Sequence, residues 1–167
     1  PSTLPEGEEY EIPFDALFLP ANAEEAGMIV PQLAFHDIDV SRLAILGGSG
    51  LNTPRFPEVG EQYAEGVFFA DGFFAASPRM EVQYFVSRFR DEYGEAPGTF
   101  SAQAYDAAAI VAEVFRSGAA TRSDVLAALG EVRDFPGVTG RTTMIPGGLI
   151  AKTPFFGTVT RGRLVSV

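Results

Sequence analysis

The chain has 167 residues, of which 46% are hydrophobic and 20% charged, a balance typical of a folded globular domain rather than a disordered chain. Its formal net charge of -10 repels phosphate backbones and anionic lipid surfaces, which argues against binding of nucleic acid or of a membrane surface. Because the chain has no cysteine, a disulfide framework, a zinc–thiolate site and a thiol nucleophile are excluded.

The front of the chain has the order of elements that is typical of a parallel sheet. Residues 1–12 are acidic and contain proline, so we interpret them as a linker or frayed arm. The apolar runs at residues 14–19 and 42–46 are typical of strands buried on both faces. A third strand is expected at residues 66–70. A helix between the first two strands would make a right-handed crossover between parallel neighbours.

That first helix has a clear start signal. Asn22 is followed three positions later by Glu25, which is the spacing of a capping box. Pro31 lies inside the apolar face that follows and is expected to kink or break the helix, because proline has no N–H to donate. The stretch through Pro54 and Pro57 is expected to form a loop.

Three helices in a row are expected in the middle of the chain. Ser77 as N-cap, with Pro78 at the first helical position, predicts a helix that ends near Gly94. Residues 98–118 predict a long second helix, and residues 121–129 predict a short third one that opens with a capping spacing.

The helix at residues 98–118 is apolar over nearly its whole surface. Its polar side chains keep to one narrow stripe, which consists of Gln103, Asp106, Glu113 and Arg116. Gly118 supplies a residue that is free to adopt the left-handed conformation at a helix end. We therefore expect this helix to be buried on most sides.

The last part of the chain is strand-like. Strands are expected at residues 139–145, 155–160 and 164–167, the last two forming a terminal hairpin. The order of elements predicts an α/β protein with a largely parallel sheet. These strands are too few for three consecutive helices, so we expect part of the sheet to lie in sequence beyond this chain. The N-terminus of the chain lacks an initiator Met and a signal-peptide pattern, which predicts that the chain is mature, processed or truncated at this end.

Several segments resemble, in their order, the C-terminal half of type I periplasmic binding proteins, the Leu/Ile/Val-binding receptors of ABC importers. The matching segments are residues 14–19, 43–50, 66–74, 85–97, 102–108, 135–140 and 159–167. A Tyr-Gly-x-x-Pro segment at residues 93–97, followed by a Tyr-Asp-Ala helix, is the more specific part of the resemblance. Ala-Gln-Ala-Tyr-Asp-Ala at residues 102–107 and Asp-Phe-Pro-Gly-Val-Thr-Gly at residues 134–140 are also similar to the branch of penicillin-binding protein activators.

The resemblance implies an α/β fold of the periplasmic-binding-protein type I class, with parts of two Rossmann-like lobes and a C-terminal β-hairpin. Residues 13–71 would form the second half of lobe two, and residues 72–148 the C-terminal part of lobe one. Residues 149–167 would be the closing strands of lobe two. The family's first half is then expected to be a partner, as the missing N-terminal half of the receptor or a swapped copy. The intact mass of the gene product tests this expectation.

One group of candidate ligand-binding residues follows the predicted strands. In open parallel sheets ligands bind at the carboxyl ends of the strands. Asn22 follows the first strand, and Ser49 and Asn52 follow the second, inside a Gly-Gly-Ser-Gly-Leu-Asn loop. These residues offer a hydroxyl and amides to a small polar ligand. The alternative is that the glycines only allow the strand to turn sharply.

A second group comes from the resemblance, in which the start of the helix at residues 98–118 faces the cleft. The amide of Gln103 or the phenol of Tyr105 would then meet a ligand, with the helix end favouring an anion such as a carboxylate. The alternative for Tyr105 is a place in the core. Phe73 at the expected crossing between lobes would line the cleft or cover the hinge. Asp106 is expected to cap or to form a salt bridge.

The sequence departs from its relatives in one respect. Amino-acid receptors of this family carry an acidic residue in the loop that holds Ser49, and an aromatic residue where this chain has Pro20 and Ala21. A desolvated ammonium group without a carboxylate partner is costly. Binding of a free branched-chain amino acid is therefore disfavoured. The ligand class expected from the resemblance is an amino acid or a small carboxylate.

Enzyme chemistry has little support. The Gly-Gly-Ser-Gly-Leu run at residues 47–51 lacks the final glycine of a nucleophile elbow, and the one histidine, His36, is interpreted as a solvated or capping residue. The glycines also lack the Lys-Ser/Thr ending of a phosphate loop. No cluster of metal-ligand residues is apparent, so neither a catalytic residue, a metal nor a cofactor is expected.

The sequence therefore predicts a non-enzymatic solute-binding receptor of the periplasm or cell envelope. The receptor would be secreted, with a lipid anchor upstream of this chain as one option. Its partners would be a small-molecule ligand and an ABC-transporter permease. The alternative is an envelope protein of the same fold that does not transport, and that binds a cell-wall synthase or another protein.

Overall fold

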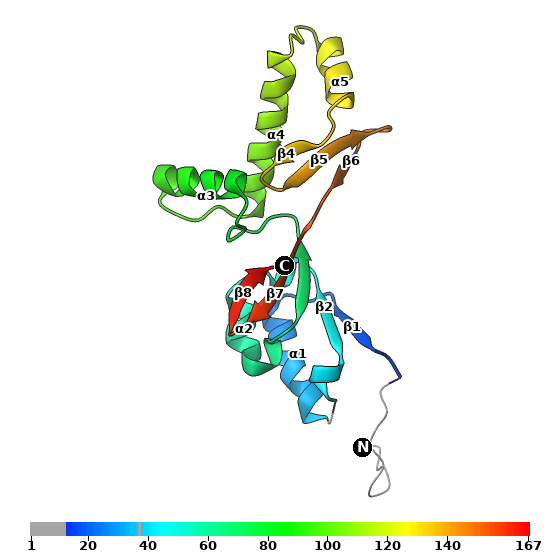
Figure 1. Cartoon of the computed structure of the whole chain (residues 1–167), viewed down its shortest axis with the longest axis vertical. Helices are drawn as coiled ribbons and strands as arrows, with labels where there is room; N and C mark the ends of the chain where they lie inside the picture. Colours follow the sequence, from blue (N-terminus) through cyan, green and yellow to red (C-terminus); the bar gives the residue numbers. More distant parts are fainter. Residues whose placement is uncertain (1–12, 37) are drawn as a thin grey trace, which may run out of the picture. The chain divides into compact units, whose positions relative to one another are not determined.

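The structure is a computed structural model that describes residues 13–36 and 38–167 (Figure 1). The linker expected at residues 1–12 lies outside the described residues. In the described ranges, none of the helices combines the length and the hydropathy that a membrane span requires.

The chain folds into two compact units. It crosses from unit 1 to unit 2 after Ala70 and returns to unit 1 after Phe155. Unit 1 contains the described residues up to Ala70, residues 156–165 and Val167, and unit 2 contains residues 71–155 and Ser166. The second passage differs from the expected boundary after residue 148. The assignment of the units to particular lobes stays a prediction.

Unit 1 is built on a five-stranded sheet with the strand order β1-β2-β3-β7-β8. Its strands are β1 (Ala16–Leu19), β2 (Ala44–Gly47), β3 (Phe68–Asp71), β7 (Phe155–Thr160) and β8 (Arg163–Ser166). Strands β1, β2 and β3 pair in parallel, with Leu19 opposite Gly47 and Gly47 opposite Phe69. The predicted parallel α/β core is confirmed.

One face of this sheet is covered and the other is open. Helices α1 (Ala23–Phe35) and α2 (Arg55–Gly60) lie on one side, where Leu19, Ile45 and Phe69 are buried (Figure 1). On the other side Phe18, Leu46 and Phe68 are 60%, 39% and 45% exposed. The expectation that these strands are buried on both faces is therefore wrong, because the described chain supplies helices for one face only.

The helices of unit 1 follow their local signals except at proline. The predicted capping box is present, since Asn22 Oδ1 accepts from the backbone of Glu24 and Glu25 at 3.0 Å each. Pro31 does not break α1, which runs continuously through it. The expected loop through Pro54 and Pro57 is instead helix α2, followed by a short 3-10 helix. Proline near a helix start loses no bond, because the first N–H groups of a helix have no partner.

Unit 2 contains the three consecutive helices that were predicted. They are α3 (Met80–Tyr93), α4 (Thr99–Arg116) and α5 (Arg122–Gly130). Helix α3 starts later than predicted, with Arg79 rather than Ser77 as N-cap. Ser77 is buried before the helix, where its carbonyl accepts from Gln83 Nε2 at 2.6 Å. Gly118 has the positive φ that was expected at its helix end, and Gly94, near which the first of these helices was expected to end, also has positive φ.

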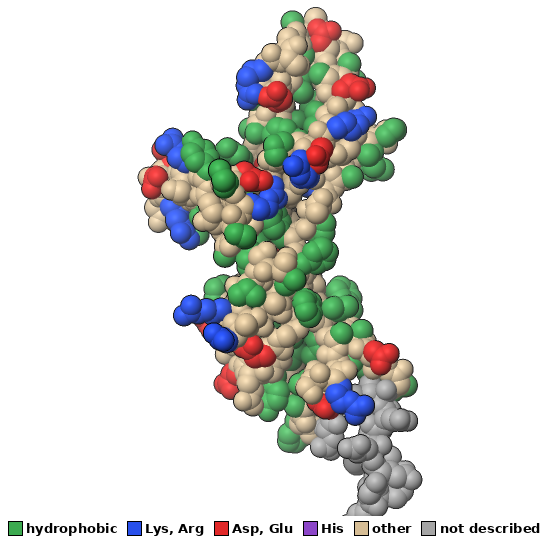
Figure 2. Space-filling view, viewed as in Figure 1, with side chains coloured by type: hydrophobic (Ala, Val, Ile, Leu, Met, Phe, Trp, Pro, Cys, Tyr) green, Lys and Arg blue, Asp and Glu red, His purple; other side chains and the backbone are tan. Residues whose placement is uncertain are grey.

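Helix α4 is less buried than its sequence suggested. Its buried residues form a single stripe of Ala102, Asp106, Ile110 and Val114. The opposite side carries exposed apolar residues, which include Phe100, Val111 and Phe115. Figure 2 shows such hydrophobic side chains on the surfaces of both units. The polar stripe was also misread, because its member Asp106 lies in the core.

A small antiparallel sheet, ordered β4-β5-β6, completes unit 2. Its strands are β4 (Phe135–Gly137), β5 (Gly140–Ile145) and β6 (Leu149–Lys152). The sequence pattern predicted only β5. Residues 149–152, which were expected among the closing strands of lobe two, instead pair with β5, Lys152 opposite Thr142. The turn between β5 and β6 needs positive φ at Gly147 and Gly148, which glycine adopts without strain.

Candidate functional site

In unit 1 the loops after β1 and β2 lie against one another. The two strands are parallel neighbours that end at Leu19 and Gly47, so their loops leave the same edge of the sheet. Gly50 lies so close to the first loop that a Cβ atom there would be 2.7 Å from the carbonyl oxygen of Ala21. The structure thus brings Asn22, Ser49 and Asn52 to one edge.

The three residues at this edge offer different groups. Asn22 uses its side-chain oxygen to cap α1, as shown above, which leaves its amide N–H groups for other partners. Ser49 is exposed and begins the 3-10 helix η2 (Ser49–Leu51), and its backbone oxygen accepts from Asn52 N at 3.1 Å. Asn52 is half-buried at the end of that turn. A hydroxyl and amides at one edge can hydrogen-bond a small polar ligand.

In unit 2 two of the predicted residues contact the same aromatic ring. The ring centroids of Phe73 and Phe85 are 6.0 Å apart, and those of Phe85 and Tyr105 are 4.7 Å apart. Phe73 is buried, whereas Tyr105 is exposed along one side. This cluster joins the start of unit 2 to α3 and α4, which favours a packing role for Phe73.

Gln103 and Tyr105 lie on opposite sides of α4. Residues two apart in an α-helix are rotated by about 200°, so their side chains do not face each other. Both are exposed. A small ligand at this helix can therefore contact the Gln103 amide or the Tyr105 phenol, and which of the two does so stays a prediction.

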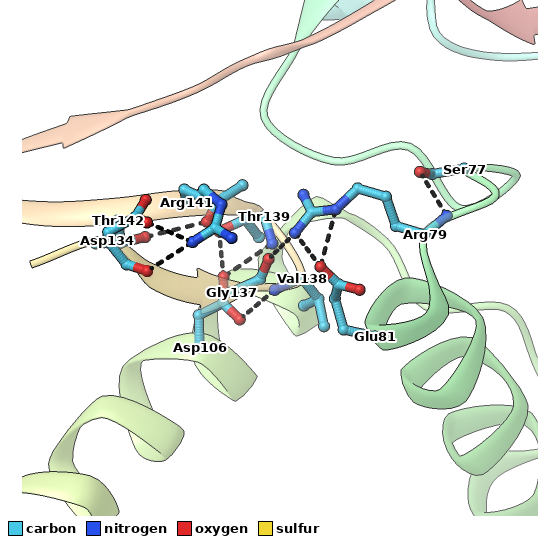
Figure 3. A network of polar contacts seen from close by, with 11 residues as sticks. Ser77, Arg79, Glu81, Asp106, Asp134, Gly137, Val138, Thr139, Arg141 and Thr142 are labelled. Atoms are coloured by element: carbon cyan, nitrogen blue, oxygen red, sulfur yellow. Dashed lines mark hydrogen bonds and ion pairs between the residues drawn. The ribbon is translucent and has the colours of Figure 1, made fainter.

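A polar network in unit 2 centres on the buried carboxylate of Asp106, which is 2% exposed (Figure 3). Its oxygens accept from Val138 N at 2.7 Å and from Thr139 N at 2.8 Å, and also from the Thr139 hydroxyl. The ammonium of Lys152 lies 3.6 Å away. Asp106 thereby ties α4 to the turn between β4 and β5, as a cap and a salt bridge.

This network explains why the two motifs of residues 102–107 and 134–140 occur together. A Cβ atom at Gly137 would overlap the Asp106 carboxylate, so glycine lets the turn approach α4. Gly140 has a φ of 102°, and a Cβ atom there would overlap the carbonyl oxygen of Thr153. Both motifs therefore have a structural role in packing unit 2.

A second part of the network surrounds Arg79 (Figure 3). Its guanidinium pairs with Glu81, donates to the carbonyl of Gly137 at 3.2 Å, and lies 5.4 Å from the ring centre of Phe155. The backbone N–H of Glu81 and the Arg79 guanidinium hold the pKa of Glu81 below its usual value. Arg79 thus joins α3 to the end of the unit at Phe155.

The arrangement does not support nucleophilic catalysis by Ser49. His36 is the C-cap of α1, and its ring meets the edge of Phe35. Ser49 lies near the other end of α1, so a 13-residue helix, about 20 Å long, separates them. Among the residues that the structure describes, no group of three or more His, Cys, Asp or Glu side chains could hold a metal ion.

A pocket of about 410 Å³ opens at the amino ends of the strands of unit 1. Its lining includes Asp15, Arg42, Tyr63 and Glu65. None of the predicted site residues lines it. Glu65 in this pocket caps the turn before β8, because it accepts from Arg161 N at 2.9 Å and from Gly162 N at 2.5 Å.

Comparison with known proteins gives the family of the chain. A family profile described as periplasmic binding protein matches residues 14–160. The chain belongs to the periplasmic binding protein family. Among curated proteins no sequence matches it.

Solved structures of this family share the type I fold. A protein assigned to branched-chain amino acid ABC transport in Rhodospirillum rubrum is 30% identical, with a TM-score of 0.84, and the match covers 92% of this chain and 44% of that one. A branched-chain amino acid transporter substrate binding protein from Streptococcus pneumoniae, in complex with isoleucine, is 31% identical, with a TM-score of 0.62 and coverage of 92% and 45%. A leucine binding protein from Thermotoga maritima is 23% identical, with a TM-score of 0.66 and coverage of 92% and 43%, and shows the fold alone.

The chain therefore spans less than half the length of these binding proteins. The relatives named are transporter binding proteins, which does not favour the resemblance to penicillin-binding protein activators. The type I fold accounts for the parallel sheet and the terminal strands of this periplasmic binding protein chain.

No motif or spacing in the sequence pointed to the residues around Arg79 or to the single lysine, Lys152. A signal was available for the Asp106 network, because an aspartate in an alanine-rich helix needs buried partners. The Pro-Gly-Val-Thr-Gly turn that supplies those partners was recognised only as a motif.

Proposed function

We propose that this chain is part of a solute-binding receptor of an ABC importer, which closes on a small ligand between two lobes. The observation that carries the proposal is the edge of unit 1 where Asn22, Ser49 and Asn52 meet, in a chain of the periplasmic binding protein family. In parallel sheets this carboxyl edge is where ligands bind. Phe73 and either Gln103 or Tyr105 are proposed as contacts from unit 2, since the last two are both exposed on α4.

The proposed ligand is an amino acid or a small carboxylate. The nearby acidic side chains already have partners, since Glu25 closes the capping box and Glu24 pairs with Arg55 at 3.2 Å. An ammonium group at this edge would lack a free carboxylate from these residues, whereas hydroxyl and amide donors suit a carboxylate. Hydrogen bonds from these hydroxyl and amide donors to the ligand carboxylate would then be the main source of binding affinity.

We further propose that the protein acts without catalysis, in the periplasm or cell envelope, and delivers its ligand to a transporter permease. The family consists of binding proteins, which supports a receptor. Closure would follow from contacts that the ligand makes in the closed state but not in the open one. Lipid anchoring upstream of the chain is part of this proposal.

The proposed partner is a further half of the receptor chain. Both units have an open apolar face, formed by Phe18, Leu46 and Phe68 in unit 1 and by Phe100, Val111 and Phe115 in unit 2. The binding proteins compared above are more than twice as long, so they contain polypeptide that can cover such faces. By analytical ultracentrifugation, the 167-residue chain alone should self-associate, with a swapped copy as partner, and a stable monomer would contradict the proposal.

Isothermal titration calorimetry of the protein against amino acids and small carboxylates tests the function. We expect saturable binding of at least one solute, and about a 100-fold or greater loss of affinity in Ser49→Trp, because the indole fills the ligand edge. Thr160→Trp is the matched control, since Thr160 is exposed on β7, whose end lies near Gly66 at the amino edge of the same sheet.

The control should bind as the parent does, and circular dichroism should show both variants folded. Saturable binding that survives Ser49→Trp unchanged would remove the proposed site. Absence of binding to any solute would contradict the receptor and favour a protein-binding role.

A further inference from the structure

The chain leaves unit 2 through a short segment, residues 153–155, that directly follows β6. Three contacts hold this segment and the residue before it. They involve the side chain of Lys152, the backbone of Thr153 and the ring of Phe155. Each contact is made to a different element of unit 2, so the segment is attached on several sides.

The first contact is an ion pair with the core of the unit. Lys152 lies at the end of β6 with its side chain 32% exposed, and its ammonium is 3.6 Å from the buried Asp106 carboxylate. The same ammonium donates to the Thr139 hydroxyl, which in turn donates to Asp106. The lysine therefore supplies the counter-charge of a buried carboxylate and a hydrogen bond to one of the donors of that carboxylate, and its loss would weaken both.

Lysine is otherwise absent from the sequence of this chain. Of the 12 basic residues, Lys152 is the only lysine, and the other 11 are arginines. An ammonium is a compact point charge, whereas a guanidinium is a wide planar fork. The compact group fits the position between the Thr139 hydroxyl and the Asp106 carboxylate.

The second and third contacts continue the attachment along the chain. Thr153 N donates to the carbonyl of Arg141 at 3.3 Å. Gly140 has no side chain, so the Thr153 carbonyl oxygen can occupy the space that a Cβ atom would fill. Phe155 is buried beneath the Arg79 guanidinium, 5.4 Å from the ring centre. The chain passes to unit 1 only after this residue.

We propose that Lys152 and Asp106 are positioning residues that hold residues 153–155 as a fixed extension of unit 2, so that bending between the units takes place outside this segment. The anchoring is independent of any ligand. The statement about bending rests on the proposed function, in which the two lobes close.

Amide hydrogen exchange of the ligand-free chain, followed by NMR, tests the anchoring. In Lys152→Gln we expect the Thr153 amide to exchange at least about tenfold faster than in the parent, because the segment opens locally without its ion pair. The Ile110 amide in the buried stripe of α4 should change less than about threefold. Lys152→Arg keeps the charge and should retain most of the protection at Thr153.

Arg122→Gln is the matched control, because it removes one positive charge from an exposed site on α5 of the same unit. It should leave Thr153 unchanged. Unaltered exchange at Thr153 in Lys152→Gln would overturn the proposal. Equal acceleration at Thr153 and Ile110 would also overturn it, since it would show a general loss of stability. Failure of the receptor function in calorimetry would leave these exchange results unaffected, so the two proposals fail separately.

Discussion

Replacement of Asp106 by alanine is expected to lower the free energy of unfolding of unit 2 by about 3–5 kcal/mol. The change leaves the buried N–H groups of Val138 and Thr139 without an acceptor and removes the counter-charge of Lys152. It also opens a small cavity in the stripe that packs α4. Asp106→Asn keeps the size and one acceptor oxygen, so a smaller loss of about 1–2 kcal/mol is expected.

Urea unfolding of both variants, followed by circular dichroism, measures this effect. Asp91→Ala is the matched control, because Asp91 is an exposed aspartate on α3. It should change stability by less than about 0.5 kcal/mol. If Asp106→Ala were no more destabilising than Asp91→Ala, the carboxylate would not be the centre of the network.

Replacement of Gly140 by alanine is expected to destabilise unit 2 by about 2–4 kcal/mol. Gly140 has a φ of 102°, which L-residues with a side chain rarely adopt. Its new methyl group would also overlap the carbonyl oxygen of Thr153, a backbone atom that cannot move aside without shifting the strand. Both effects act at the point where β5 begins.

Gly130→Ala is the control for this substitution, since Gly130 ends α5 with open space around it and no positive φ. It should be neutral or stabilise by up to about 1 kcal/mol, because alanine favours the helix. Thermal unfolding of the two variants side by side distinguishes them. A Gly140→Ala protein as stable as the parent would show that the turn can relax.

Much of the order of elements could be predicted because it rests on local signals. The capping box at Asn22 and the glycine ends of α3 and α4 depend on neighbours within a few residues. The short strands β4 and β6 were missed because they form only by pairing with β5. Helix α2 was missed because prolines were taken as loop signals, although a helix start tolerates them.

The candidate site was predictable in part for the same reason. The carboxyl edge with Asn22, Ser49 and Asn52 follows from strand order, and the structure brings these loops together. The sequence does not decide between Gln103 and Tyr105 as a ligand contact, because residues two apart in one helix point to different sides of it. The role of residues in unit 2 as ligand contacts stays a prediction.

The sequence by itself determined the family, the parallel strands of unit 1 and the positions of the long helices, because periodicity and caps are properties of short segments. Tertiary structure decided which faces of those elements are covered. The apolar α4 has one buried stripe, and the sheet of unit 1 is open on the side of Phe18, Leu46 and Phe68. Tertiary structure also decided the role of Asp106, whose partners lie more than 30 residues away along the chain. Burial and long-range pairing depend on which segments meet in space, and no local pattern contains that information.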